Sequence, residues 1–243
     1  MPGRRCGRRK TLRKSRVRTI GSIVGAGLWQ APREPPAESV AMIVAFARQF
    51  GSGSKRVAAA VARELGYALI DDQLPESVAI RLETSPEDVR GREDRTESFG
   101  ERLLRSLQAG TPEVNAALRS ADDEVICEIE RLVREYADRG SCVIIGHGST
   151  QILRERSDVL TVLVRAPLEW RARRVADWWN VSYEVARAEV ERVDRARAAH
   201  MLEHYNQELI DLDAYAIVVD TQALGFEAAS AAIVAAVQAK TAA

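Results

Sequence analysis

The chain has 243 residues, of which 46% are hydrophobic and 29% are charged. This composition excludes a disordered chain and is sufficient for one globular domain with a mobile insertion. The formal net charge is zero but unevenly spread, because residues 1–40 hold ten Lys/Arg against two Glu, and the remainder holds 25 basic and 33 acidic residues. A basic arm therefore precedes an acidic body.

Residues 1–41 are interpreted as a basic extension and Pro-rich linker that stands outside the domain at 42–243. Clustered Arg and Lys neutralise phosphates, so nucleic-acid binding is considered only for this arm. No run reaches the 18 or more apolar residues that a membrane span needs, and residues 19–29 lack a convincing signal-peptide cleavage site after them. We expect a cytoplasmic protein without membrane contact.

Short apolar runs alternate with helical patterns from Met42 onward. A strand at 42–47 is expected to lead through a glycine-rich loop into a helix whose apolar face is Val57, Ala60, Val61 and Leu65. Residues 73–139 are mostly helical and contain a polar, charge-rich patch. The remaining strands are expected at 67–72, 141–146, 159–166 and 215–221, and the remaining helices at 167–179, 183–210 and 226–239.

This alternation predicts an α/β protein built from parallel βαβ units. In such sheets, ligands bind outside the carboxyl ends of the strands. The loops after residues 47, 71, 146 and 166 should therefore face one crevice. The pattern does not determine the oligomeric state.

The first of these loops, "RQFGSGSK" at 48–55, is typical of a phosphate-binding loop. Gly51 and Gly53 let the backbone turn and expose N–H groups at the start of a helix, which together form an anion site. In the common form G-x-x-x-x-G-K-[ST], a Lys follows the last Gly. Here Ser54 takes that place and Lys55 comes one position later.

Two charged helices carry further candidates, each with an alternative interpretation. Arg171 and Arg174 share a helix face and could clamp phosphate oxygens, or that face could be solvated. Asp194 and Arg197 could contact a substrate or form a surface ion pair. Outside these sets, His200 and His204 at i, i+4 spacing suggest a zinc site, but no third ligand is evident. Trp178 or Trp179 could cover a nucleobase, although packing is the simpler interpretation of these side chains.

Six motifs follow one another along the chain in an order that resembles the cytidylate-kinase-like branch of the P-loop nucleoside monophosphate kinases. They are "RQFGSG", "LIDDQL", "CVIIGHGS", "APLEWRARR", "DRAR" and "YAIVVDT". The resemblance covers essentially residues 42–240. It implies a three-layer α/β P-loop kinase fold with a parallel central sheet, a helical insertion that binds the monophosphate, and an Arg-rich lid at about 170–205.

The resemblance also implies ATP and Mg²⁺ as cofactors and a nucleotide or other small molecule as acceptor, such as CMP. Asp71 matches an acid that lines the acceptor site, and Asp194 with Arg197 matches a D-x-x-R pair that contacts the acceptor. Arg171 and Arg174 match the arginines of the lid. As catalytic residues, Arg171, Arg174 and Arg197 could supply the positive charge that the missing loop lysine would have given. The loop would bind ATP phosphates through residues Arg48, Gly51, Ser52, Gly53, Ser54 and Lys55.

One motif departs from the family pattern. Members usually have Arg where "GHG" places His147, and that Arg is expected to bind the acceptor phosphate. A neutral imidazole offers one donor where guanidinium offers five, so this binding should be weaker or the acceptor different. His147 could serve if protonated, or it could be a turn residue bonded to backbone. The alternative to a kinase is a nucleotide-binding regulatory protein of the same fold with little or no activity.

Overall fold

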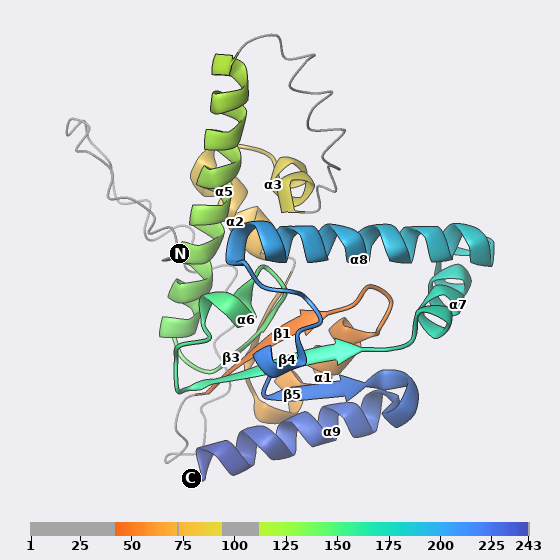
Figure 1. Cartoon of the computed structure of the whole chain (residues 1–243). Coiled ribbons are helices and arrows are strands. Elements are labelled where there is room, and N and C mark those ends of the chain that lie inside the picture. Colours follow the sequence, from red (N-terminus) through yellow and green to blue (C-terminus); the bar gives the residue numbers. More distant parts are fainter. Residues whose placement is uncertain (1–41, 72, 94–111, 243) are drawn as a thin grey trace.

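The computed structural model describes residues 42–71, 73–93 and 112–242 (Figure 1). These form a five-stranded parallel sheet in the order β2-β3-β1-β4-β5, with helices on both faces. The predicted α/β class with a parallel central sheet is thereby confirmed. The arm and linker at 1–41 lie outside the described residues, as do residues 94–111, which include the second half of the charge-rich patch.

The strands occur where the sequence predicts them, with ends that differ by one or two residues. They are β1 (Ile43–Arg48), β2 (Ala68–Ile70), β3 (Cys142–Ile145), β4 (Val159–Arg165) and β5 (Ile217–Asp220). The helices are α1 (Ser54–Leu65), α2 (Gln73–Leu82), α3 (Pro86–Glu93), α5 (Pro112–Asp138), α6 (Ser149–Ile152), α7 (Leu168–Trp179), α8 (Tyr183–Tyr205) and α9 (Thr221–Thr241).

Two predicted helix boundaries were wrong. The helix predicted at 183–210 ends at Tyr205, because Asn206 adopts left-handed φ and ψ angles of 51° and 40° and terminates α8. The helix predicted at 226–239 begins at Thr221, where the Asp220 carboxylate accepts hydrogen bonds from the backbone N–H groups of the first turn. Gly225, with φ 74° and ψ 168°, kinks α9.

β1 is buried on both faces because successive side chains of a strand point to opposite sides of the sheet. Ile43 and Ala45 pack in the core formed with α2, α3 and α5. Val44 and Phe46 pack in the second core, formed with α1 and α9. Each fully buried Val, Ile or Phe contributes roughly 1.5–3 kcal/mol, so β1 holds the two helical layers on one sheet.

α1 buries a wider face than the sequence predicts. Val57 and Val61 are buried as expected, and Ala58 and Ala62 are buried with them. Ala60 and Leu65 were also predicted to be buried, but they are only half-buried. The reason is that α1 packs against both the sheet and α9.

Among the described helices, α9 alone is long and apolar enough to cross a membrane by length and composition. Three of its side chains lie on one face at i, i+4 and i+8: Ala229, Ile233 and Val237. They are buried in the core shared with α1 and the sheet. The apolar character of this face is explained by packing in the core.

The parallel sheet brings four loops to one edge, as predicted. Phe46 of β1 pairs with Ile145 of β3, Arg48 of β1 pairs with Val164 of β4, and Ile70 of β2 lies opposite Ile144 of β3. The loops after these strands are therefore neighbours, and α7 lies beyond the carboxyl end of β4 and leads into α8 (Figure 1). This edge is where a ligand site is expected.

An ion-pair network joins α2 to α5. Arg81 donates to Glu128 at 2.8 Å and to Glu135 at 2.7 Å. The hydrogen bond from Arg81 lowers the pKa of Glu135 below its ordinary value. The pair between Arg81 and Glu135 therefore contributes its full stabilisation only while Glu135 is ionised.

Arg81→Met should reduce the pH dependence of the free energy of unfolding. Since the folded-state pKa of Glu135 lies below the ordinary value of 4.5, its stabilisation is present above that pH and is lost as the pH falls through the folded-state value. The difference between wild type and variant should shrink between about pH 6 and about pH 3 in denaturant titrations. The control Arg187→Met removes an exposed ion pair with Glu191 within α8 and should leave the free energy of unfolding nearly unchanged at every pH. A pH-independent difference for Arg81→Met would contradict this assignment.

Candidate functional site

The glycine loop between β1 and α1 has the geometry of an anion site. Gly51 and Gly53 have φ angles of 77° and 79°, a region that residues with a Cβ rarely adopt. Gly53 is the N-cap of α1 and makes no side-chain capping bond. The N-terminal backbone N–H groups of a helix have no partner within the helix, so this turn can bind phosphate oxygens.

The loop is fixed from behind by a buried ion pair. Arg171 of α7 is 4% exposed and donates to the carbonyl oxygens of Phe50 and Ala166, at 2.8 Å each. Its Nη1 is also 2.6 Å from Oδ2 of Asp194 in α8. The other Asp194 oxygen accepts the Phe50 N–H at 2.8 Å. Arg171 and Asp194 together therefore attach α7 and α8 to the loop.

Arg174 lies on the open side of the same loop. Its Nη1 donates to the Gly51 carbonyl at 3.1 Å. Its guanidinium stacks between Trp170 and Phe226, with ring centroids at 4.7 and 4.6 Å. Burial, together with repulsion from Arg56, lowers the pKa of Arg174. An anion bound beside these two cations would relieve that repulsion.

The start of α9 completes the loop's surroundings. The Thr221 hydroxyl donates to the Ser52 carbonyl at 2.7 Å. Phe226 lies so close to Gly53 that a Cβ built on the glycine would be 2.2 Å from the ring. Sequence reasoning missed both residues, although they follow directly on β5. The carboxyl end of β5 reaches the same edge as those of the other strands, and that signal was available.

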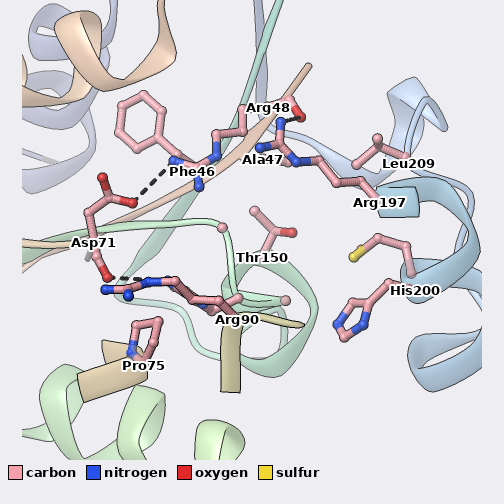
Figure 2. A pocket seen from close by; sticks show the side chains of 14 residues that line it. Phe46, Ala47, Arg48, Asp71, Pro75, Arg90, Thr150, Arg197, His200 and Leu209 are labelled. Carbon is pink, nitrogen blue, oxygen red and sulfur yellow. Dashed lines mark hydrogen bonds and ion pairs between the residues drawn. The ribbon is translucent and has the colours of Figure 1, made fainter. Parts of the chain in front are cut away.

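Asp71, at the end of β2, is the centre of a second polar group. Its carboxylate is 3.1 Å from Nη1 of Arg48 and 2.8 Å from Nζ of Lys55. Nε2 of His147 lies 3.3 Å from the Asp71 backbone oxygen. His147 has a φ of 55° within the "GHG" turn. Figure 2 shows Asp71 beside Arg48 at the wall of a pocket that also contains Arg197 and His200.

Two cavities lie at this edge of the sheet. A cavity of about 610 Å³ is lined by Arg48, Gln49, Phe50, Gly51, Gly53, Ser54, Lys55, Arg56, Arg174, Val175, Asp177, Trp178 and Arg197. A cavity of about 170 Å³ is lined by Phe46, Ala47, Arg48, Asp71, Pro75, Arg90, Gly146, His147, Gly148, Thr150, Arg197, His200, Met201 and Leu209. Arg48 and Arg197 line both cavities, so the two are adjacent.

The predicted site residues thus separate into three groups. Those that line the larger cavity are Arg48, Gly51, Gly53, Ser54, Lys55, Arg174 and Arg197. Asp71 and His147 line the smaller one. Ser52 is fully buried and its hydroxyl donates to the Gln49 carbonyl at 2.8 Å. Arg171, Asp194 and Ser52 are absent from both linings, and the contacts of their side chains in this structure are with protein groups around the loop.

Sequence reasoning also missed lining residues at both cavities. His200 and Met201 come three and four residues after Arg197 on α8, and this helical spacing would have placed them on the same face. Arg90 of α3 had no such signal, because its position depends on how α3 packs. The His200 and His204 rings are 4.6 Å apart, but no group of three or more potential metal ligands occurs within the described ranges.

Asp194→Ala should destabilise the fold by about 3 kcal/mol, because it leaves the buried Arg171 charge without its carboxylate. The Phe50 N–H also loses its acceptor, so the loop should become less ordered. The control Glu191→Ala removes only exposed pairs on the same helix and should cost about 0.5 kcal/mol. Equal losses in denaturant titrations would show that Asp194 does not fix the loop.

Gly53→Ala should destabilise the chain by roughly 1–3 kcal/mol and distort the loop, because its φ is unfavourable and its Cβ would meet Phe226. Gly140→Ala is the control for backbone strain alone, since φ is 117° there and no atom lies within 4 Å of the built Cβ. Thermal unfolding should show a larger loss for Gly53→Ala. A larger loss for Gly140→Ala would rule out the steric explanation.

Comparison with known proteins agrees with this geometry. Residues 43–223 match the model of the Cytidylate kinase-like family. The cytidylate kinase of Ignicoccus hospitalis is 34% identical over 107 residues, which are 44% of this chain and 62% of that protein. The cytidylate kinase of Natronomonas pharaonis is 26% identical over 199 residues, 82% of this chain and 90% of that protein. The chain thus spans less than two thirds of the first of these relatives.

A solved structure supports the fold. An uncharacterized protein from Eubacterium ventriosum superposes with a TM-score of 0.60 at 17% identity, covering 81% of this chain and 98% of that one. At this identity the likeness concerns the fold alone.

Proposed function

Because the chain belongs to the cytidylate kinase-like family, we propose that it transfers the γ-phosphoryl group of ATP to a nucleoside monophosphate such as CMP. The observation that carries this proposal is the adjacency of the two cavities, whose common wall includes Arg48 and Arg197. Phosphoryl transfer requires donor and acceptor in line, with positive charge around the transferred group. Two arginines at the junction of the cavities would supply that charge.

The larger cavity is the proposed donor site. The N–H groups at the start of α1 would bind the β- and γ-phosphates, and Lys55, Arg56 and Arg174 would add positive charge. The exposed Trp178 at the rim offers an indole face to the nucleobase. Because Arg174 already contacts Gly51, this cation is close to the loop before any ligand arrives.

The residues present fit a Mg²⁺ ion that is bound mainly by substrate phosphates. Mg²⁺ keeps several waters and takes few protein ligands, usually hydroxyl or carboxylate oxygens. Ser54, a buried hydroxyl at the start of α1, lines the larger cavity. The Ser54 hydroxyl and a water held by Asp71 would hold the ion. When bound, the ion would neutralise charge on the phosphates.

The smaller cavity is the proposed acceptor site. Arg48, Arg90, Arg197, His147 and His200 give its lining a basic character suited to a monophosphate. Nε2 of His147 lies within hydrogen-bonding distance of the Asp71 backbone oxygen, as expected for a turn residue bonded to backbone. A ring N–H that donates to this oxygen is not available to a phosphate, so the arginines would bind the acceptor phosphate.

We propose that α7 and α8, about residues 170–205, are the lid, and that its closure excludes water and limits ATP hydrolysis. Within the lid, Arg171 and Asp194 would act as positioning residues for the loop, since their contacts are with Phe50. Arg174 and Arg197 remain proposed catalytic residues because both line the donor cavity.

The alternative is a nucleotide-binding regulatory protein with little turnover. It is favoured by Ser54 at the usual lysine position and by His147 in place of an arginine. The ion pair between Lys55 and Asp71 also favours it, because that lysine is engaged away from the loop. The two functions differ in one measurable property, the dependence of ADP release on an acceptor.

ADP release from Mg·ATP should depend on added nucleoside monophosphate, with CMP tested beside UMP, dCMP, AMP and GMP. Arg174→Met should lower kcat/KM by roughly 10²–10³-fold, because a positioned donor to the phosphates is lost. The control is Arg173→Met, an exposed neighbour on α7 outside both cavities, which should change the rate less than about twofold. ATP binding without acceptor-dependent ADP would establish the regulatory alternative.

A further inference from the structure

Asp71 lines the smaller cavity and also pairs with two cations that line the larger one. Lys55, at 2.8 Å from Oδ2, lines the larger cavity, whereas Arg48, at 3.1 Å from Oδ1, lines both. Asp71 itself lines the smaller cavity, and Figure 2 shows its carboxylate directed toward Arg48. One carboxylate therefore connects the displaced lysine of the glycine loop with the acceptor side of the site.

The two ion pairs differ in how readily they separate. The side chains of Arg48 and Asp71 are 17% and 13% exposed, whereas that of Lys55 is 54% exposed. A solvent-exposed ammonium gains little free energy from an ion pair with a carboxylate. A multiply charged triphosphate at a helix N-terminus attracts the same ammonium more strongly. Donor binding should therefore draw Lys55 away from Asp71 and leave Arg48 in place.

We propose that Lys55 is a positioning residue that couples donor binding to acceptor binding through Asp71. Without donor, Lys55 occupies Oδ2, and an acceptor hydroxyl or amine must displace it to reach that oxygen. Once donor phosphates hold Lys55, Oδ2 accepts a hydrogen bond from the acceptor. An ionised carboxylate has about four acceptor positions, so Arg48 and a water can remain bound to Asp71.

This inference rests on the proposed phosphoryl transfer and adds positive cooperativity between donor binding and acceptor binding to it. The coupling must be reciprocal, because linkage requires the acceptor to raise the donor's affinity by the same factor. The displaced lysine thereby acquires a task that a lysine at the usual position does not have. When the donor triphosphate binds, the Lys55 ammonium moves from Asp71 to the phosphates, and the Asp71 carboxylate can then bind the acceptor.

The test is isothermal titration of CMP into the full chain, with and without a saturating non-hydrolysable ATP analogue and Mg²⁺. For wild type, the analogue should tighten CMP binding on the order of fivefold. For Lys55→Met, the affinity of the variant for CMP should be the same with and without the analogue. The variant should thus gain acceptor affinity in the absence of donor, which a loss of structure would not produce.

Two further variants show whether the coupling between donor and acceptor binding depends on Lys55 itself or only on positive charge at the larger cavity. Arg56→Met removes the neighbouring cation, which lines the same cavity but lies 4.0 Å from Glu227 and makes no ion pair with Asp71. It should weaken analogue binding and keep the coupling factor. Lys55→Arg keeps the charge and should also keep coupling. An Arg56→Met chain without coupling would overturn the specific role of Lys55.

Turnover data distinguish failure of this inference from failure of the proposed function. If wild type binds neither ATP analogue nor CMP and releases no acceptor-dependent ADP, both are overturned. If wild type transfers phosphoryl groups to CMP but Lys55→Met shows the same coupling factor as wild type, only the inference is overturned.

Discussion

The rest of the candidate site depends on the hydrogen bonds and the ion pair made by the buried guanidinium of Arg171. It binds the carbonyl oxygens of Phe50 and Ala166 and the carboxylate of Asp194, so it joins the ends of β1 and β4 to α7 and α8. A charge buried to this extent is tolerated only when its hydrogen bonds are satisfied. The loop conformation and the placement of α7 and α8 are therefore mutually dependent.

This arrangement separates two tasks among the basic residues of α7 and α8. Arg171 supports the loop from behind, whereas Arg174 and Arg197 face the cavities. Arg174 is held between Trp170 and Phe226 and has a lowered pKa from burial and from Arg56. Positive charge is thus concentrated where phosphate oxygens would be bound, before a ligand is present, which is the preorganisation that phosphoryl transfer requires.

At the smaller cavity, Asp71 likewise joins several elements of the fold. It joins the end of β2 to Arg48 of β1 and Lys55 of α1, and through its backbone oxygen to the turn after β3. The lysine that comes late in the loop motif is therefore engaged, and its partner belongs to the neighbouring cavity. Departures from a motif can be compensated by residues distant in sequence, because the parallel sheet brings several loops to one edge.

The sequence by itself determined the sheet, the glycine loop and the edge at which the site lies, because these depend on local patterns: apolar runs, helical spacing and glycines before a helix. It did not show that Arg171 and Asp194 support the loop or that Lys55 pairs with Asp71, and although it placed Thr221 and Phe226 after the last strand, it did not show that they contact the loop. Each of these depends on contacts across more than a dozen residues of chain, up to 173 in the case of Phe226 and Gly53. Only tertiary packing decides which of several similar arginines is buried and which carboxylate a lysine contacts. Charge and spacing along one helix are the same whether a given side chain is buried or exposed.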